Sequence, residues 1–388
     1  MNTPKIRFKG FTDDWEQRKF EDVGTVAMCK RIFKEQTSEE GEVPFYKIGT
    51  FGGIPDAYIT RELFEEYKKN YQYPNKGDIL ISASGSIGRT VEYTGKDEYY
   101  QDSNIVWLKH GNDLDNSFLK VLYDVIEWSC EGSTIKRLYN DNFLKTEFML
   151  PKIEEQIKIG EYFSKLDHLI TLHQRKCDET KELKKFMLQK MFPKNGEKNP
   201  EIRFAGFTDD WEQRKVGEFL TESRESGHKG DIAHKMTVKL WGKGVYEKKE
   251  TGSANTQYFT RHAGQFIYSK LDFLNCAFGV VPEELENLET TADVPAFDCD
   301  GVNPYFMFYT AIQPRFYEKN GMIADGSRKA KRIHADTFLD MPFFVPSLKE
   351  QNKIVNLLSE LDNLITLHQR KCEKLKELKK YMLQNMFV

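Results

Sequence analysis

The 388-residue chain has a formal net charge of −3, with 30% charged and 39% hydrophobic residues. This balance is typical of folded globular proteins and excludes a disordered polyelectrolyte. No apolar run approaches the roughly 20 residues that a membrane span needs, and the first residues contain no apolar leader, so we expect a cytoplasmic protein. The length allows two or three domains, each able to bury its own core.

Two segments of the chain occur twice, in the same order. The sequence IRFKGFTDDWEQRK at residues 6–19 returns as IRFAGFTDDWEQRK at 202–215. Likewise, LDHLITLHQRKC at 166–177 returns as LDNLITLHQRKC at 361–372. The long stretches enclosed between these segments hardly resemble each other. The flanking segments of the repeat, called the frame below, are nearly constant, whereas the enclosed stretches, called the heads, differ. This pattern indicates one scaffold that carries two different heads.

The two variable stretches, residues 20–150 and 216–345, are predicted to be mainly β structure with short helices. In the first, a strand at 79–81 leads into a loop of small residues, and in the second a strand at 266–268 leads into a loop that begins at Ser269. Because strand and loop follow in the same order, we expect the two heads to share a fold and to differ at this loop.

Each variable stretch closes on a Gly-Ser turn followed by basic residues. The first reads GSTIKR at 132–137, and the second reads GSRKAKR at 326–332. Backbone N–H groups and cationic side chains in such a turn suit a DNA phosphate or a base edge. An ordinary turn before a strand explains the same residues, so both interpretations stay open.

Residues 154–191 and 349–386 contain no proline and are rich in strong helix formers, which predicts two long helices. Their apolar residues recur at spacings of three and four, which is the pattern of a coiled-coil seam. The seam positions are Ile159, Phe163, Leu166, Ile170 and Cys177 in the first copy, and Ile354, Leu358, Leu361, Ile365, Cys372 and Leu375 in the second. We expect the helices to pack antiparallel, with the heads at opposite ends and a pseudo-twofold axis between them.

The six cysteines include no C-x-x-C pair and no zinc-finger spacing, so we expect buried free thiols. Basic and aromatic residues gather in both variable stretches, although the net charge is slightly negative. A solvated surface would explain any one of these clusters. Together, they favour a polyanionic partner.

The two halves close on the same signature, LPKIEEQ at 150–156 and VPSLKEQ at 345–351, each at the start of a predicted long helix. A tryptophan, Trp15 or Trp211, precedes each variable stretch, and each helix contains L-D-x-L-I. This order of features closely resembles the specificity subunit of type I restriction-modification systems. The resemblance covers essentially the whole chain.

The resemblance implies a DNA-recognition subunit without catalytic activity of its own. Each variable stretch would be a target recognition domain that reads one half of a split, asymmetric site in double-stranded DNA. The helices would set the spacer between the half-sites and dock the partner subunits. Two modification subunits would bring S-adenosylmethionine, two restriction (motor-nuclease) subunits would bring ATP and Mg²⁺, and no membrane is implied.

The motifs of an enzyme are missing from the sequence. No phosphate-binding loop of the form GxxxxGK(S/T) is present. The nearest match to the N/D-P-P-Y/F motif of adenine methyltransferases is NPYF at 303–306, which lacks the second proline. Two other classes of function are kept as alternatives: a coiled-coil scaffold without sequence-specific DNA binding, and an autonomous enzyme that acts on DNA.

We therefore predict an α+β protein with two mixed α/β target recognition domains and a pseudo-twofold internal repeat. The expected boundaries are 1–150 for the first recognition domain, 151–192 for the central helix, 193–345 for the linker and second recognition domain, and 346–388 for the C-terminal helix. Polar, basic and aromatic residues on predicted loops are the candidate DNA contacts: Lys30, Arg31, Ser84, Ser86, Arg89, Lys136, Arg137, Lys239, Trp241, Lys243, Lys270, Asp272, Arg328, Lys329 and Arg332. We predict no catalytic residue, no metal ligand and no cofactor bound by this chain.

Overall fold

The computed structural model describes residues 3–132, 136–194, 197–250, 252–322, 325–327 and 330–388. The chain divides into two compact units: unit 1 contains Met1–Gln174 and Gln369–Val388, and unit 2 contains Arg175–His368. Each unit holds one β-rich head and part of each of two long helices. Within the described ranges, no helix is both long enough and apolar enough to cross a membrane.

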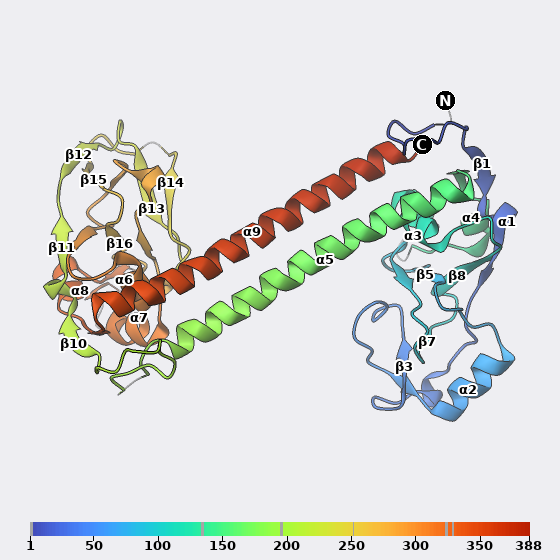
Figure 1. The fold of residues 1–388 in the computed structure, drawn as a ribbon, viewed down its shortest axis with the longest axis horizontal. Helices are drawn as coiled ribbons and strands as arrows, with labels where there is room; N and C mark the ends of the chain where they lie inside the picture. The colour runs from blue at the N-terminus through green and yellow to red at the C-terminus, as the bar shows by residue number, and fades with distance from the viewer. Residues whose placement is uncertain (1–2, 133–135, 195–196, 251, 323–324, 328–329) are drawn as a thin grey trace. The chain divides into compact units, whose positions relative to one another are not determined.

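The two long helices form where the sequence predicts them: α5 spans Ile153–Lys190 and α9 spans Leu348–Met386 (Figure 1). Acidic residues occupy both first turns, where the helix dipole favours negative charge. The packing of α5 explains its single glycine, because a Cβ at Gly160 would overlap the hydroxyl of Ser117 at the start of helix α3 (Asn116–Val125).

Segments of α5 and α9 pair within each unit. In unit 1 the first part of α5 lies beside the last part of α9, where Lys379 forms an ion pair with Asp167 at 2.8 Å. In unit 2 the last part of α5 lies beside the first part of α9, where Lys184 pairs with Asp362 at 2.6 Å. The prediction of antiparallel packing is therefore confirmed in each unit.

The predicted apolar stripe of each helix contacts two different neighbours. Its first positions, represented by Phe163 in α5 and Leu358 in α9, are buried in the hydrophobic cores of the heads. Further along, Cys177 and Cys372 are buried against the facing helix. Only the later part of the stripe is therefore a helix–helix seam, and the earlier part fastens each helix to a head.

In its described residues, the head of unit 1 contains three sheets. Its order of elements is β1 (Glu16–Lys19), α1 (Phe20–Val23), β2 (Gly24–Ala27), η1 (Lys34–Gln36), β3 (Val43–Tyr46), β4 (Tyr58–Ile59), α2 (Arg61–Asn70), β5 (Ile79–Ser82), β6 (Thr90–Glu92), β7 (Tyr99–Tyr100), β8 (Ile105–His110), α3, α4 (Asn140–Lys145) and β9 (Glu147–Leu150). The main sheet has the order β2-β8-β5-β6, a second sheet has the order β4-β3-β7, and β1 pairs with β9.

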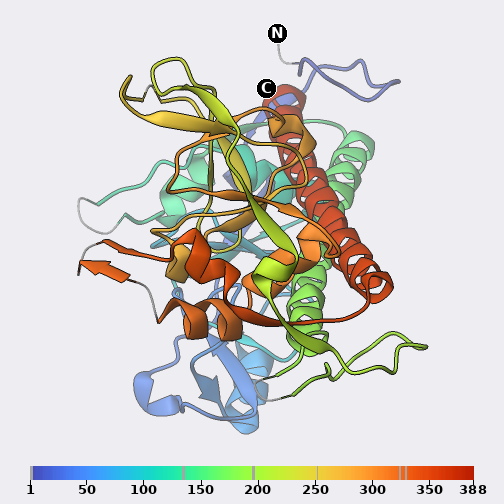
Figure 2. The same ribbon diagram turned by 90° about the vertical axis from the view of Figure 1, so that its left-hand side faces the viewer.

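The head of unit 2 is built on the same plan with additional strands. Its elements are β10 (Glu212–Lys215), η2 (Val216–Glu218), β11 (Leu220–Ser223), β12 (Ser226–Lys229), β13 (Lys235–Val238), β14 (Val245–Lys248), β15 (Gln257–Thr260), β16 (Phe266–Tyr268), η3 (Phe273–Asn275), β17 (Phe278–Val280), η4 (Glu283–Leu285), β18 (Glu289–Thr290), β19 (Ala296–Cys299), α6 (Pro304–Ala311), α7 (Pro314–Gly321), β20 (Asp325–Ser327), β21 (Ala330–Arg332), α8 (Ala335–Leu339) and β22 (Pro342–Val345). The sheets have the orders β11-β19-β16-β17, β12-β15-β18-β13-β14, β10-β22 and β20-β21. Figure 2 shows the β20–β21 hairpin extending from the body of this head.

The two heads share their main sheet but not their second sheet. Strands β5 and β16 occupy the same inner position of the four-stranded sheets, which confirms the strands predicted at 79–81 and 266–268. The second sheet has three strands in unit 1 and five in unit 2. The prediction that the heads differ at one loop was therefore wrong, because pairings between distant strands such as β13 and β18 build a different sheet.

All six cysteines are free thiols. Four are buried as predicted, whereas Cys130 and Cys299 are partly exposed. Burial raises the pKa of Cys29 to about 12 and that of Cys276 to about 11, so both thiols stay protonated and unreactive at neutral pH.

Candidate nucleic-acid interface

A buried ion pair joins the repeated N-terminal segment of unit 1 to helix α5. The Nε and Nη2 atoms of Arg7 donate to the two carboxylate oxygens of Glu155 at 2.7 and 2.8 Å. The indole Nε1 of Trp15 donates to the same carboxylate at 3.2 Å. Glu155 is only 1% exposed, and its hydrogen bonds with Arg7 raise the pKa of that guanidinium. This joint gives the repeated Arg and Glu a shared structural role.

The glutamine of the same signature fixes the first turn of α3. Gln156 Oε1 accepts a hydrogen bond from the backbone N–H of Asp115, the N-cap of α3, at 2.9 Å. Its Nε2 donates to the carbonyls of Pro151 and Asp113 at 2.8 and 3.0 Å. One side chain therefore ties the start of α5, the end of β9 and the start of α3 together.

Unit 2 contains the same joint. The Nε and Nη2 atoms of Arg203 donate to the carboxylate of Glu350 at 2.7 and 2.8 Å. Gln351 accepts from the backbone N–H of Asn303, the N-cap of α6, at 2.8 Å and donates to the carbonyl of Pro346 at 2.9 Å. Asn303 also caps α6 through its own side chain, which gives the NPYF segment a structural role. The indole of Trp211 differs from that of Trp15, because its Nε1 is buried and has no hydrogen-bond partner among the described residues.

Each repeated segment also contacts the end of a long helix. The backbone N–H of Ile6 donates to the carbonyl of Asn385 at 2.9 Å, and that of Ile202 donates to the carbonyl of Lys190 at 3.0 Å. The repeated segment therefore spans from the start of one helix to the end of the other within its unit. The constant parts of the sequence are the parts that make these joints.

In head 1, two of the predicted contact residues converge on Asn104. Ser84 Oγ donates to Asn104 Oδ1 at 2.7 Å, and Arg137 Nη2 lies 3.4 Å from the same oxygen. A backbone bridge also joins Ser84 to Arg137. The loop after β5 and the turn that closes the head, far apart in sequence, thus form one cluster, which we call the Asn104 cluster.

The other predicted residues of head 1 lie around this cluster or farther from it. Arg31 is exposed and pairs with Asp102 at 2.9 Å, two residues from Asn104. Arg89 donates to the carbonyl of Ile48 at 2.7 Å. The remaining three side chains are exposed and are not drawn together by any contact in the described structure: Lys30, Ser86 and Lys136.

In head 2, three predicted residues occupy the turn between β13 and β14. Lys239 lies over the ring of Tyr246 at 5.3 Å, and Lys243 is exposed. Trp241 is 61% exposed and has a φ of +62°, a left-handed conformation that is strained for a large side chain. Strain of this kind gathers at functional sites, so the exposed Trp241 is the strongest single candidate in this head.

Two further predicted residues of head 2 contact Asp293. The backbone N–H of Lys270 donates to its carbonyl at 2.8 Å, and Arg332 Nε pairs with its carboxylate at 3.3 Å. The predicted Asp272 is instead a turn residue, since its carboxylate accepts from Ser269 Oγ and Asn275 Nδ2. The predicted Arg328 and Lys329 lie outside the described residues.

Sequence reasoning missed the residues that organise these clusters. Asn104 and Asp293 hold the predicted cations in place, and Asn275 links the turn of Trp241 to the loop after β16, since its carbonyl accepts from the Trp241 backbone N–H at 2.8 Å. The signal available for Asn104 was its place in the polar Gln-Asp-Ser-Asn turn between two strands. Asp293 carried no comparable signal.

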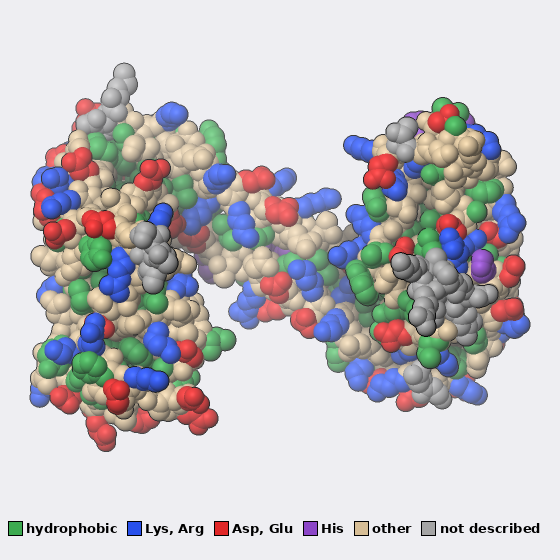
Figure 3. All heavy atoms as spheres, turned by 180° about the vertical axis from the view of Figure 1, so that it is seen from behind, with side chains coloured by type: hydrophobic (Ala, Val, Ile, Leu, Met, Phe, Trp, Pro, Cys, Tyr) green, Lys and Arg blue, Asp and Glu red, His purple; other side chains and the backbone are tan. Residues whose placement is uncertain are grey.

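Charges of both signs cover the heads. Figure 3 shows Lys and Arg side chains interspersed with Asp and Glu over both heads on one face of the molecule. In the part of the chain that the structure describes, no group of three or more His, Cys, Asp or Glu residues is placed to hold a metal ion. Any contact with a polyanion would therefore depend on local clusters rather than on a uniformly basic face.

Fold and joints together define a protein with two different heads on one repeated frame. The sequence profile of the type I restriction modification DNA specificity domain matches residues 12–182 and 293–377. This match covers well over half of the chain, and the chain belongs to that family.

The relatives agree with this assignment. A Haemophilus influenzae protein named as a type I restriction enzyme specificity subunit is 55% identical over 150 residues, which are 38% of this chain and 39% of that protein. The Methanocaldococcus jannaschii MjaVIII specificity subunit is 22% identical over 332 residues, covering 79% of this chain and 74% of its own. The crystal structure of the type I restriction-modification S subunit from M. genitalium covers 100% of this chain and 99% of its own with a TM-score of 0.63 and 14% identity, which shows a shared fold.

Proposed function

We propose that the chain is the DNA-recognition subunit of a type I restriction-modification complex, with no catalytic activity of its own. Each head reads one half of a split, asymmetric sequence in double-stranded DNA, and the paired helices set the spacer. The observation that carries this proposal is the joint: Arg7–Glu155 and Arg203–Glu350 hold two different heads on one frame. Relatives named as specificity subunits support it.

In this proposal the Asn104 cluster is the reading surface of head 1. Arg137 supplies a guanidinium, which pairs well with guanine, and Asn104 supplies an amide, which pairs well with adenine. Ser84, Arg31, Ser86, Arg89, Lys30 and Lys136 contribute phosphate or base contacts around it. The ion pair of Arg31 with Asp102 is exposed and weak enough to open for a phosphate.

Head 2 reads through the turn of Trp241 and through Arg332. An exposed aromatic side chain can stack on a sugar or on an unstacked base, while the flanking Lys239 and Lys243 contact phosphates. Lys270 and Arg332 lie beside Asp293, and Arg332 is the candidate for a base contact. Arg328 and Lys329, which lie outside the described residues, stay proposed DNA contacts, and Asp272 is proposed to shape the loop that carries Lys270.

Exposed apolar residues on the long helices support the docking of two copies of one partner. They occupy equivalent positions of the repeat: Leu169, Leu378 and Tyr381 in unit 1, and Leu364, Leu183 and Phe186 in unit 2. Matching apolar patches on a charged helix surface are typical of protein interfaces. We propose that two modification subunits dock there with S-adenosylmethionine, and that two restriction subunits bring ATP and Mg²⁺, in the cytoplasm.

Methylation mapping tests the proposal. The chain is coexpressed with its modification subunit in a host that lacks adenine methylation, and methyladenine is mapped by single-molecule sequencing. The proposal predicts one split motif with two defined halves and a fixed spacer. A stable complex with an active partner that leaves the DNA unmethylated would contradict it and would favour a scaffold.

A further inference from the structure

Asn104 and Asp293 stand at equivalent places of the main sheets of the two heads. Strands β5 and β16 are the matching inner strands, and Leu80 and Ile267 occupy the same place in them, three residues after a glycine. Asn104 stands three residues before the β8 residue that pairs with Leu80. Asp293 stands three residues before the β19 residue that pairs with Ile267. The two polar residues are therefore counterparts.

In head 1 a chain of backbone hydrogen bonds leads from Asn104 to the segment that contains Arg137. The carbonyl of Asn104 accepts from the N–H of Ala83 at 2.7 Å, and the carbonyl of Ala83 accepts from the N–H of Leu138 at 2.8 Å. Arg137 directly precedes Leu138, and its Nη2 lies 3.4 Å from Asn104 Oδ1. The backbone thus places the guanidinium beside the amide.

Head 2 repeats these bonds at the equivalent residues. The carbonyl of Asp293 accepts from the N–H of Lys270 at 2.8 Å, and the carbonyl of Lys270 accepts from the N–H of Ile333 at 3.0 Å. Arg332 directly precedes Ile333, and its Nε lies 3.3 Å from Asp293 Oδ1. Both heads therefore place one arginine beside one Asn or Asp, and we call these two pairs the Arg–Asx sites.

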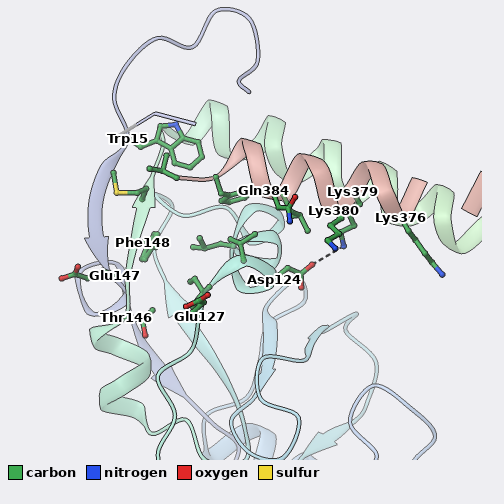
Figure 4. A pocket seen from close by; sticks show the side chains of 17 residues that line it. Trp15, Asp124, Glu127, Thr146, Glu147, Phe148, Lys376, Lys379, Lys380 and Gln384 are labelled. Atoms are coloured by element: carbon green, nitrogen blue, oxygen red, sulfur yellow. Dashed lines mark hydrogen bonds and ion pairs between the residues drawn. The ribbon is translucent and has the colours of Figure 1, made fainter. Parts of the chain in front are cut away.

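The Arg–Asx sites are open surfaces. Arg137 is exposed, and the side chains of Arg332 and Asp293 are 36% and 48% exposed. The cavity of about 870 Å³ in unit 1 lies beside the end of α9 (Figure 4), and neither residue of the Arg–Asx site of head 1 is among its described lining residues. An open pair of polar side chains suits the edge of a base pair in a groove better than an enclosed small molecule.

The two sites leave different hydrogen-bonding groups for a partner. An arginine can only donate, so the Asn104 atom that faces Arg137 and Ser84 is the oxygen, and Nδ2 is left to donate. The ionised carboxylate of Asp293 can only accept, and one of its oxygens faces Arg332. Head 1 therefore presents donors, whereas head 2 presents a donor beside an acceptor.

We propose that positions 104 and 293 determine which base each head selects, an inference that rests on the proposed function. In the major groove a purine N7 is an acceptor, whereas the exocyclic amino groups of cytosine and adenine are donors. Asn104 donates to an acceptor such as a purine N7, beside the acceptor bonded by Arg137. Asp293 accepts from the amino group of cytosine or adenine, while Arg332 donates to an adjoining acceptor.

The ion pair makes a carboxylate tolerable beside DNA. The phosphates repel an isolated carboxylate, whereas Arg332 balances the charge of Asp293. Because both side chains are partly exposed, their pairing is weak enough to rearrange on a base. The competing explanation is that Asp293 only holds Arg332 in place and touches no base, so the test has to detect the base amino group itself.

The test uses the full chain in complex with its modification subunit and duplexes that carry its own methylated motif. One base at a time in the half-site of head 2 is replaced by an analogue without its exocyclic amino group, purine for adenine or 2-pyrimidinone for cytosine. At one position the wild type should bind about tenfold or more weakly, because a hydrogen bond to a charged group is lost. Asp293→Ala should lose less than about threefold there, since it has no such bond to lose.

Asp340→Ala is the matched control, because Asp340 is an exposed aspartate of head 2 that pairs with Lys215 at 2.9 Å. It should be as sensitive to the missing amino group as the wild type. The analogue weakens the base pair equally for every variant, so the difference between Asp293→Ala and Asp340→Ala isolates the contact.

Asn104→Asp is the converse change, which keeps the shape of the side chain and adds an acceptor to head 1. At one position of the half-site of head 1, preference should move toward cytosine or adenine by about fivefold or more. The half-site of head 2 should stay unchanged.

Equal sensitivity to the missing amino group in Asp293→Ala and the wild type would overturn the proposal. A loss of preference at every position of the half-site would also overturn it, because it indicates a distorted head. In both cases the split motif of the wild type remains, so the proposed function stands. A wild-type complex without any sequence preference would refute the proposed function and this inference together.

Discussion

Units 1 and 2 hold their heads by the same ion pair but differ in the indole beside it. In unit 1 Trp15 donates to Glu155, whereas in unit 2 the indole Nε1 of Trp211 is buried without a hydrogen-bond partner among the described residues, and Glu350 is bonded by Arg203 without it. A hydrogen bond to a carboxylate is worth about 1.5–3 kcal/mol, while removing one partner of a buried ion pair costs about 3–5. The frame therefore tolerates the loss of one bond at the joint but keeps the carboxylate and the guanidinium paired.

Breaking the shared ion pair should have the largest effect. The guanidinium groups of Arg7 and Arg203 are partly buried, with 14% and 15% of their side chains exposed. Glu155→Gln and Glu350→Gln leave these groups without their carboxylates, so each should destabilise its own unit by about 2–3 kcal/mol. Hydrogen exchange measured by mass spectrometry reports the two units separately. Glu16→Gln, at an exposed glutamate that pairs with Arg18, is the control and should change stability by less than about 0.5 kcal/mol. A loss at Glu155 no larger than the control would refute the role given to the joint.

Removing one guanidinium from either head should impair recognition of one half-site and leave recognition of the other unchanged. Arg137→Ala should weaken or relax recognition of one half-site only, and Arg332→Ala of the other only, each by about 1–3 kcal/mol if it contacts a base. Binding to duplexes mutated in one half at a time measures this, and each variant is the control for the other. Equal loss at both halves would contradict two independent heads.

The indoles should show the difference between the joints directly. Trp15→Phe removes a hydrogen bond to the carboxylate of Glu155, whereas Trp211→Phe removes none among the described residues, so the first should cost about 1.5 kcal/mol more than the second. Because both substitutions remove the same atoms, their difference in urea unfolding isolates the bond. Equal costs would show that the Trp15 indole adds nothing to the joint.

Protonation of His262 should affect only the head of unit 2, and by the smallest amount. Hydrogen bonds with Glu225 and Glu286 raise the pKa of His262 above 6.5. Its contribution to stability is therefore complete below pH 6.5 and is lost as the pH rises through the raised value. In unit 1, His110 bonds only to the neutral groups of Asn116 and Gly111. The protection of amides near β15, corrected for the intrinsic pH dependence of hydrogen exchange, should fall above pH 6.5 in the wild type and show no such step in His262→Gln.

The sequence predicted the parts of the fold that repeat. Proline-free runs of helix formers predicted both ends of α5 and both ends of α9 to within one residue. The signatures at 150–156 and 345–351 indicated the family. What could not be predicted is set by contacts between distant residues. The partners of Arg7 and Arg203 lie about 147 residues away along the chain, and no local pattern identifies them.

The same limit applies to the candidate contacts. Ser84 and Arg137 were chosen from separate loops, but their shared partner Asn104 follows only from the pairing of β5 with β8. Asp272 was chosen as a polar residue on a predicted loop, yet its carboxylate already accepts hydrogen bonds from Ser269 and Asn275 because the loop folds back on itself. Residue type indicated which loops carry polar groups, and only the fold shows which of those groups are already paired.

Exchange of one head is the most direct test of whether each head reads its own half-site. Residues 216–345, which lie between the joint-forming segments of unit 2, are replaced by the corresponding stretch of another family member, and methyladenine is mapped after coexpression with the modification subunit. If the two heads read DNA independently, the methylated motif should stay split and should keep the half-site read by head 1. The other half-site should change. A change in the half-site of head 1, in a chimera that folds and binds its partner, would contradict it.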